Sequence, residues 1–252
     1  MTERLLEINQ EGHNIRCALF TERKGDYDAL ILFCHGFAGY KDNGQAKNII
    51  ERVLSKYPRT AALAFDWPCH GADVKKKLCL ADCYAYLRLV TQYARQTYPS
   101  ARLLGYGTSF GAFIQLAYSN QYGNPFEKLV LRSPAINLYD SITERIISAA
   151  ELEKIQKGKT VPVGFDRKVN VEDSFLRELR QTDLREMSFI DEADNILLIH
   201  GTKDEIIPYS IVRDFSEDNV MELISVDGAD HRFQHPAHQE AAIKALLAFF
   251  VL

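Results

Sequence analysis

The chain has 252 residues, of which 46% are hydrophobic, 25% charged and 11% aromatic, and its formal net charge is −4. These values exclude a disordered, collagen-like or low-complexity chain, and a core of this size needs no disulfide or metal ion to hold it together. The acidic balance also argues against a nucleic-acid-binding protein, because the one basic run, Lys75–Lys77, is short enough to be a solvated loop or helix start.

Six short apolar runs have the composition of strands that are buried on both faces. They are rich in Leu, Ile, Val, Ala and Phe without clean alternation, which is typical of a parallel sheet. These runs are Ala29–Cys34, Thr60–Phe65, Arg102–Gly105, Lys128–Leu131, Ile196–His200 and Met221–Val226. Before them, Asn14–Phe20 is predicted to be a strand of an antiparallel lead-in.

Helical patterns separate the apolar runs. In Ala46–Lys56 the apolar residues recur at the spacing of one helix face, and Pro99 ends the pattern that begins at Cys79. The other two patterns are Phe110–Gln121 and Pro236–Leu252. Strands that alternate with helices predict crossover units and a mostly parallel, doubly wound α/β sheet.

The alternation breaks once, between Leu138 and Glu186, where 19 of 49 residues are charged. Two helical patterns lie on either side of the segment that begins with Lys157–Phe165, and we expect two helices with a short hairpin between them. A structureless loop of this length would be unusual inside a compact domain. We therefore expect a core of residues 1–134 and 190–252, and a lid of residues 135–189 inserted on top of the sheet.

Targeting signals are not evident in the chain. The N-terminal segment Met1–Glu7 alternates charged and apolar residues, and the longest apolar run, Ala245–Leu252, is too short to cross a bilayer. The five cysteines have no regular spacing, which argues against a disulfide framework. We expect a cytoplasmic protein with reduced thiols and no transmembrane segment.

The motif Gly107-Thr108-Ser109-Phe110-Gly111 lies between a predicted strand and a predicted helix. A serine that attacks a carbonyl must stand clear of the backbone, and the G-x-S-x-G turn achieves this because its glycines let the strand and the helix pass close together. The pattern fixes only three positions and can arise by chance, but its strand–turn–helix context favours Ser109 as a nucleophile.

An acid and a base follow Ser109 in the chain. Asp204 lies just past the strand Ile196–His200, and His231 lies just past the strand Met221–Val226. The carboxyl ends of parallel strands lie along one edge of the sheet, so Ser109, Asp204 and His231 are expected to become neighbours.

Other side chains compete for these two roles. Aspartates are common in turns, so a purely structural Asp204 is an alternative. Among the competing acids, Glu205 is expected to point away from Asp204, and Asp230 is too close to His231 along the chain to orient its ring. The competing histidines are His35, His70, His200, His235 and His238; only His231 follows the appropriate strand in a loop.

Two backbone N–H groups are candidates for an oxyanion hole. Phe110 begins the helix after Ser109, and Phe37 lies in the turn His35-Gly36-Phe37 after the first parallel strand. His35 itself is expected to bond to the backbone and hold this loop.

With these segments in place, the chain resembles the α/β-hydrolases over nearly its whole length. The matching patterns are H-G-F at 35–37, G-x-S-x-G at 107–111, H-G-x-x-D-x-x-x-P at 200–208 and G-A-D-H at 228–231. The chain is most similar to small esterases with an insertion after the sixth strand, such as bacterial cinnamoyl or feruloyl esterases and monoacylglycerol-lipase-like hydrolases. The resemblance implies Ser109 as nucleophile, His231 as base, Asp204 as orienting acid, and Phe37 and Phe110 as oxyanion donors.

The chain departs from this family pattern in two places. Thr108 precedes the nucleophile where many relatives carry His, Tyr or Trp, and Asp66–Asp73 replaces the more usual D-x-x-G-H-G-x-S loop. Neither change removes a reacting group, but because of both changes the substrate of a particular relative cannot be assigned to this chain.

The function expected from these residues is hydrolysis of a small-molecule carboxylic ester through an acyl-enzyme, without a cofactor. The alternatives are thioester, peptide or carbon–carbon hydrolysis on the same triad, and a non-catalytic binding protein on the same fold. A metal site built from Cys69, His70, Cys79 and Cys83 is a weaker alternative because the paired spacing of structural zinc is missing. In the insertion, Ile142, Ile146, Val161, Val163 and Phe165 either contact an acyl group or only anchor the lid.

Overall fold

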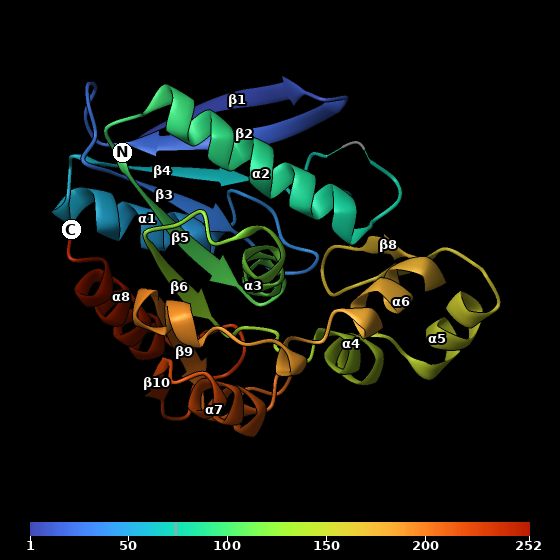
Figure 1. Ribbon diagram of the computed structural model, residues 1–252. Coiled ribbons are helices and arrows are strands. Elements are labelled where there is room, and N and C mark those ends of the chain that lie inside the picture. The colour runs from blue at the N-terminus through green and yellow to red at the C-terminus, as the bar shows by residue number, and fades with distance from the viewer. Residues whose placement is uncertain (74) are drawn as a thin grey trace.

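One large sheet forms the middle layer of the protein (Figure 1). The structure is a computed structural model that describes residues 1–73 and 75–252. In this part of the chain the sheet consists of β1 (Thr2–Gln10), β2 (His13–Thr21), β3 (Ala29–Cys34), β4 (Thr60–Phe65), β5 (Arg102–Thr108), β6 (Lys128–Arg132), β9 (Ile196–Gly201) and β10 (Glu222–Val226). Their spatial order is β1-β2-β4-β3-β5-β6-β9-β10. The β1–β2 and β2–β4 pairs are antiparallel, and the remaining pairs are parallel.

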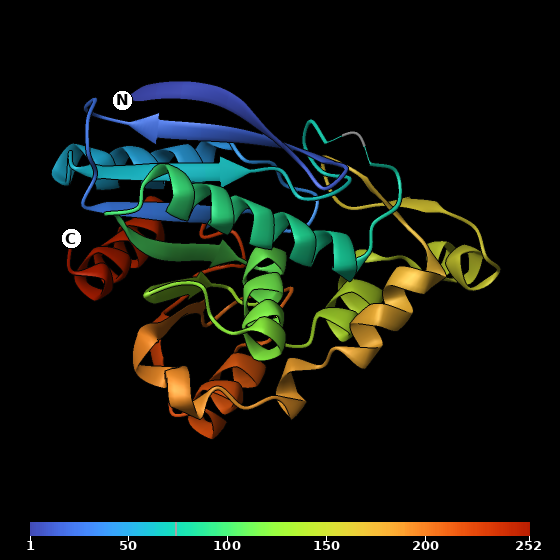
Figure 2. The ribbon, with the colours of Figure 1, turned by 45° about the horizontal axis from the view of Figure 1, so that its top comes forward.

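Helices cover both faces of the sheet. They are α1 (Gly44–Lys56), α2 (Leu80–Thr97), α3 (Phe110–Tyr122), α7 (Tyr209–Asp218) and α8 (Pro236–Phe250). Figure 2 shows α2 and α3 across one face, with α1 and α8 behind the other. Apolar residues of α1 and α8 form one buried cluster with the sheet, and those of α2, α3 and α7 join a second.

The central strands explain why the sheet must be covered on both sides. Every residue of β3 is buried, and successive side chains alternate between the two apolar clusters. Leu30 and Leu32 face the α2 and α3 side, whereas Ile31 and Phe33 face the α1 and α8 side. Because side chains on a strand alternate between faces, a continuous apolar run produces this double burial, and the predicted doubly wound α/β architecture is confirmed.

The chain between β6 and β9 leaves the sheet and returns to it. It contains α4 (Leu138–Ser141), the π-helical turn η1 (Ile142–Ile146), α5 (Ala149–Gln156), β7 (Val161–Val163), β8 (Val169–Val171), α6 (Asp173–Gln181), and the 3₁₀ turns η2 (Leu184–Glu186) and η3 (Ile190–Asn195). Strands β7 and β8 pair in an antiparallel hairpin between helices, as the sequence predicts. In Figures 1 and 2 the part of this segment from α4 to α6 lies beyond the carboxyl ends of β5 and β6, and η3 returns the chain to the start of β9.

Two elements were not expected from the sequence. Strand β1 is mostly exposed, with only Ile8 buried, because it is an edge strand held by backbone pairing to β2. Helix α7 is short and buries only three of its residues, Val212, Phe215 and Ser216. Within the described residues, no helix combines the length and apolar character that a bilayer crossing demands.

Candidate active site

A strained turn places Ser109 between β5 and α3. Its backbone has φ 50° and ψ −112°, in the region of positive φ that residues other than glycine rarely occupy. The N–H of Ser109 donates to the carbonyl of Arg132 on β6, at 3.1 Å. The turn therefore lifts the hydroxyl above the carboxyl edge of the sheet, directly at the N-terminus of α3.

Two glycines make this turn possible. A Cβ at Gly111 would overlap the carbonyl oxygens of Cys34 and His35, and a Cβ at Gly107 would overlap the side chain of Gln115. Both glycines are thus required by close approach of neighbouring backbone and side-chain atoms. The G-x-S-x-G spacing is explained by these contacts as well as by the geometry of Ser109.

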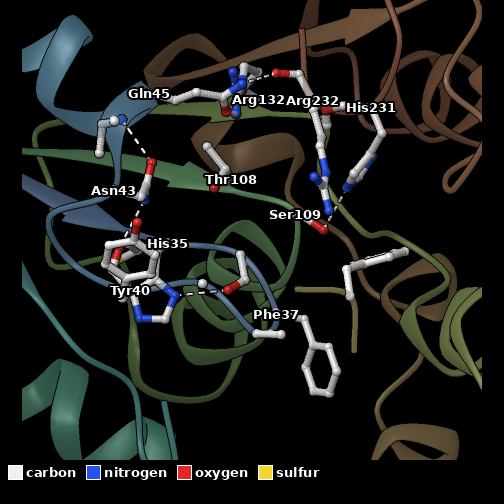
Figure 3. Close-up of a pocket in the computed structure, with 18 of the residues that line it drawn as sticks. His35, Phe37, Tyr40, Asn43, Gln45, Thr108, Ser109, Arg132, His231 and Arg232 are labelled. Atoms are coloured by element: carbon white, nitrogen blue, oxygen red, sulfur yellow. Dashed lines mark hydrogen bonds between the residues drawn. The ribbon is translucent and has the colours of Figure 1, made fainter. Parts of the chain in front are cut away.

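Three side chains from distant parts of the chain form one hydrogen-bonded line. His231 Nε2 lies 3.1 Å from Ser109 Oγ, and His231 Nδ1 lies 2.8 Å from Asp204 Oδ2. Asp204 comes from the loop after β9 and His231 from the loop after β10, whose strands are parallel neighbours. Figure 3 shows Ser109 and His231 pointing toward each other along one side of a cavity. The structure thus brings together the three residues that the sequence singled out.

Asp204 is held as a buried acceptor. Its second oxygen, Oδ1, accepts hydrogen bonds from the N–H groups of Ile206 at 2.9 Å and Ile207 at 2.7 Å. Burial alone raises the pKa of Asp204, but His231, His200 and the Ile207 N–H together lower this pKa below its usual value. A carboxylate that stays ionised accepts from His231 Nδ1, which leaves Nε2 free to accept a proton from Ser109.

The two competing acids have other partners. Glu205 Oε2 accepts from the backbone N–H of His231 at 3.1 Å, and Asp230 Oδ1 accepts from the N–H of Gln234 at 2.8 Å. Glu205 therefore contacts the backbone of His231 and not its ring. Because it follows Asp204 in a tight loop, its longer side chain reaches the His231 backbone, while Asp204 reaches the ring.

His200 is a buried neighbour of the triad that was considered from the sequence only as a competitor for the base. Its Nε2 lies 2.9 Å from the carbonyl of Ile207 and 3.4 Å from Asp204 Oδ2. Burial lowers the pKa of His200, so it is a neutral donor behind the carboxylate. The signal for this role is its position at the end of β9, four residues before Asp204.

The two backbone N–H groups that the sequence suggested as oxyanion donors lack an acceptor among the described residues. Phe110 is the first residue of α3, so its N–H has no acceptor inside the helix. The N–H of Phe37 has no intramolecular acceptor among the described residues. The two phenyl rings pack edge to face, with centroids 5.9 Å apart. Ring packing therefore connects the two backbone segments that would hold the oxyanion.

Buried polar contacts fix the loop that carries Phe37. His35 Nε2 accepts from the N–H of Trp67 at 3.2 Å, and the Trp67 indole donates to the His35 carbonyl at 2.9 Å. His35 is thus hydrogen-bonded to a backbone group, as expected. Burial lowers the pKa of His35 to about 4. The fully buried Asp66 accepts from the backbone N–H of Lys41 at 2.8 Å and from its Nζ at 3.0 Å. The role of Asp66 was missed because its partners are distant in sequence.

A cavity of about 770 Å³ opens in front of Ser109 and His231. The inserted segment contributes Ile146 and Phe165 to its wall, together with Asp166 and Arg167. Of the five apolar residues singled out in the insertion, the other three, Ile142, Val161 and Val163, are buried in the core instead. Of the five, only Ile146 and Phe165 therefore border the space in front of Ser109.

No resident metal site is formed by the described residues: no three His, Cys, Asp or Glu side chains gather closely enough to bind an ion. The five cysteines, including Cys69, Cys79 and Cys83, are free thiols. Burial raises the pKa of the Cys69 thiol to about 12.

Comparison with known proteins gives one family match and one curated relative. The profile of the prolyl oligopeptidase family matches residues 60–252. A monoacylglycerol lipase of Mycolicibacterium smegmatis is 25% identical over 142 residues, which are 55% of this chain and 49% of that protein. The matched region therefore spans about half the length of this relative.

Solved structures resemble the chain over nearly its entire length. Est1E from Butyrivibrio proteoclasticus, solved with bound ferulic acid, has a TM-score of 0.79 and 20% identity, with 98% of this chain and 100% of that chain covered. Mouse alpha/beta hydrolase domain-containing protein 10 has a TM-score of 0.72 and 16% identity, with 98% of each chain covered. These likenesses confirm the predicted α/β-hydrolase fold and the predicted resemblance to small esterases.

Proposed function

This chain belongs to the prolyl oligopeptidase family, and we propose that it is a serine hydrolase that cleaves carboxylic esters through an acyl-enzyme on Ser109. The hydrogen-bonded line Ser109–His231–Asp204 carries the proposal, because it joins a strained, accessible hydroxyl to a base whose tautomer is fixed. The printed names of a similar lipase and of a similar esterase domain from Rhodothermus marinus, which has a TM-score of 0.70 and 20% identity, support an ester substrate.

In the acylation step, Ser109 Oγ bonds to the ester carbonyl carbon while His231 Nε2 takes the hydroxyl proton. Asp204 stabilises the imidazolium that forms. The carbonyl oxygen becomes an oxyanion that accepts from the N–H groups of Phe37 and Phe110, each contributing about 3 kcal/mol. The carbon–oxygen bond to the alcohol then breaks, and His231 returns its proton to the leaving oxygen.

Deacylation repeats this sequence with water. His231 takes a proton from the water as its oxygen bonds to the acyl carbon, and the oxyanion occupies the same two N–H groups. The bond to Ser109 Oγ breaks, and Oγ regains the proton from His231. The products are the free carboxylic acid and an enzyme that is unchanged.

We also propose that residues 135–189 act as a lid over this cavity. Ile146 and Phe165 reach the cavity wall, and Phe175 of α6 packs against Phe110 with ring centroids 6.4 Å apart. A segment that contacts both the substrate space and the oxyanion side of the turn is suited to select the substrate.

Peptide hydrolysis is the second candidate function because the matching family is one of peptidases by its description. The same triad serves either reaction, and the leaving group differs. A matched pair of substrates, p-nitrophenyl butyrate and the corresponding p-nitroanilide, separates the two. We expect the ester to be cleaved; cleavage of the anilide alone would favour a peptidase.

The test of the catalytic assignment is the activity of Ser109→Ala on short p-nitrophenyl esters. We expect kcat/KM to fall by at least about 10³-fold, because the nucleophile is removed. Ser100→Ala is the matched control, since Ser100 is exposed and lies near the opposite end of β5. A loss smaller than about tenfold in Ser109→Ala would contradict the assignment.

A further inference from the structure

Arg132 is a buried cation beside the nucleophile. It ends β6, pairs in register with Thr108, and its carbonyl accepts from the N–H of Ser109. Only 6% of the residue is exposed, and it lines the same cavity as Ser109 and His231. In Figure 3, Arg132 and Gln45 lie at the end of the cavity opposite Phe37.

The guanidinium of Arg132 is incompletely satisfied. Nη2 donates to Gln45 Oε1 at 3.3 Å, the guanidinium carbon lies 5.2 Å from the centroid of Phe233, and Nε is buried with no partner. Among the described residues, no carboxylate lies within ion-pair distance of Arg132. A buried charge without a counter-ion is strongly unfavourable, so an acceptor that is not part of the chain is expected here.

A second donor without an acceptor lies on the next strand. Tyr106 of β5 is 3% exposed and lines the cavity, and its hydroxyl is buried without a hydrogen-bond partner. Burial raises the pKa of Tyr106 and the nearby charge of Arg132 opposes this rise, so the hydroxyl remains a neutral donor close to the guanidinium. Two buried donors therefore share one region of the cavity wall.

The N-terminus of α1 borders the same region. Asn43 caps the helix by accepting from the N–H of Ala46, whereas the N–H groups of Gly44 and Gln45 have no acceptor among the described residues. All four residues line the cavity, and the first turn carries no acidic residue. The positive end of the helix dipole therefore adds to the charge of Arg132.

Most of the charged side chains around the cavity are positive. Besides Arg132, the described lining residues include Lys41, Arg167 and Arg232, and the only carboxylate among them is that of Asp166. Lys41 is neutralised by Asp66, and Arg167 and Arg232 are exposed at the rim. In a chain whose net charge is −4, a cationic cavity is a local feature that favours anionic ligands.

We infer that Arg132, Tyr106 and the first turn of α1 bind an anionic group, a carboxylate or a similar oxyanion, of the ester that Ser109 cleaves. The inference rests on the proposed function and adds the substrate class, an ester that carries a second, negatively charged group. The guanidinium and the phenol donate to its oxygens, and charge-assisted bonds of this kind are among the stronger hydrogen bonds in proteins.

The experiment compares matched acidic and neutral esters. For an anion on the acyl side, the pair is mono-p-nitrophenyl adipate and p-nitrophenyl hexanoate. For an anion on the alcohol side, the pair is 4-carboxyphenyl butyrate and phenyl butyrate. We expect the wild-type kcat/KM to be at least about tenfold higher for the acidic member of one pair. The pair that shows the preference identifies the side that carries the charge.

Arg132→Met removes the charge and keeps an apolar stem of similar shape. We expect it to lower the acidic-to-neutral ratio of kcat/KM by about 10- to 100-fold, and Tyr106→Phe to lower it severalfold. Arg52→Met is the control, because Arg52 is exposed on α1 and pairs with Glu240 outside the cavity. It removes one positive charge and should leave the ratio unchanged.

The ratio separates recognition from a structural role. If Arg132 only supports Gln45 and Phe233, Arg132→Met lowers both activities equally, the ratio stays constant and the inference fails. If Arg132→Met does not fold, Arg132→Lys is used. Lysine keeps the charge but lacks the planar set of N–H donors of the guanidinium, so this variant should keep only part of the preference for the acidic ester. A folded Arg132→Lys with the full wild-type ratio would overturn the role of the guanidinium.

Failure of this inference is distinguishable from failure of the proposed function. Wild-type protein that cleaves the neutral esters, but prefers neither acidic ester, would overturn the anion site and leave the esterase assignment intact. Protein that cleaves none of the four esters would overturn the proposed esterase activity, and the anion site with it.

Discussion

The carboxyl edge of the sheet and the inserted segment between β6 and β9 border one cavity, but they contribute to it differently. At the edge, Asp204 and His231 are fixed by hydrogen bonds of 2.7 to 3.1 Å to side chains and backbone. In the inserted segment, Ile146 and Phe165 reach the cavity with apolar side chains. Polar geometry of this kind serves every substrate, whereas an apolar wall distinguishes substrates by size. Changes to these hydrogen-bonded groups should therefore lower the activity on all esters, and changes in the insertion should depend on the substrate.

The largest effect is expected from Asp204→Asn. The amide cannot hold the His231 tautomer that accepts the Ser109 proton, so kcat/KM should fall by about 10³- to 10⁴-fold for all esters. Glu205→Gln is the matched control because Glu205 accepts only from the His231 backbone N–H. Kinetics on p-nitrophenyl acetate and octanoate measure both variants. A similar loss in the two variants would show that Asp204 has no special role.

The next largest effect concerns stability at the same edge. In Gly111→Ala the added Cβ meets the Cys34 and His35 carbonyl oxygens, which are backbone atoms that cannot move away freely. The free energy of unfolding should fall by about 2 kcal/mol or more, as measured by urea denaturation. Gly44→Ala is the control, since, apart from its chain neighbours and the backbone of its own helix, no atom of the described residues lies within 4 Å of the position that its Cβ would occupy. Equal stability of the two variants would contradict the close approach at Ser109.

Groups at the sheet edge should also make the free energy of unfolding depend on pH. Burial lowers the pKa of His35 to about 4 and that of His70 to about 3, while the insertion contains no histidine. In the unfolded chain these histidines take up protons below about pH 6.5, whereas in the folded protein they stay neutral. The free energy of unfolding should therefore decrease as the pH falls from about 6.5 to about 4, by about 1.4 kcal/mol per pH unit for each histidine.

His70→Asn tests this pH dependence. Asparagine retains a donor for the Pro68 carbonyl, which accepts from His70 Nδ1 at 2.8 Å. The variant removes one titrating group, so the slope of unfolding free energy against pH should decrease by the equivalent of one proton. An unchanged slope in urea denaturation series between pH 4 and 7 would argue against a neutral, buried His70.

The smallest effect is expected in the insertion. Phe165 is 43% exposed and lines the cavity, so Phe165→Ala should lower kcat/KM for p-nitrophenyl octanoate by about three- to tenfold and leave the acetate nearly unaffected. Glu153→Ala, an exposed change on α5, is the control. An equal loss of kcat/KM on both esters would show that Phe165 supports the reaction itself and does not select substrates by size. The insertion would then not differ from the sheet edge in this respect.

The sheet edge and the insertion also differ in how well their structure was predicted from the sequence. The strands that build the edge were predicted with nearly correct bounds because burial on both faces leaves a continuous apolar run, as in β3 and β4. In the insertion, the β7–β8 hairpin was predicted, but which apolar residues reach the cavity was not. Val163 and Phe165 differ by two positions, and tertiary contacts alone decide that one is buried and the other exposed.

For the polar residues of the site, a different factor decided which of them could be predicted from the sequence. Ser109, Asp204 and His231 follow strand ends, so the topology of a parallel sheet was enough to place them together. Arg132 was missed because the predicted strand stopped at Leu131, and an arginine after an apolar run resembles a solvated terminus. Its burial depends on α1 and on Phe233, which are remote in sequence.

Labelling with a fluorophosphonate, followed by intact mass measurement and peptide mapping, tests whether Ser109 is the activated nucleophile. Such a probe reacts with a serine only where a base activates it. We expect one adduct per chain, located on Ser109, and strongly reduced labelling in Asp204→Asn. An unlabelled protein, or an adduct on another residue, would contradict this expectation.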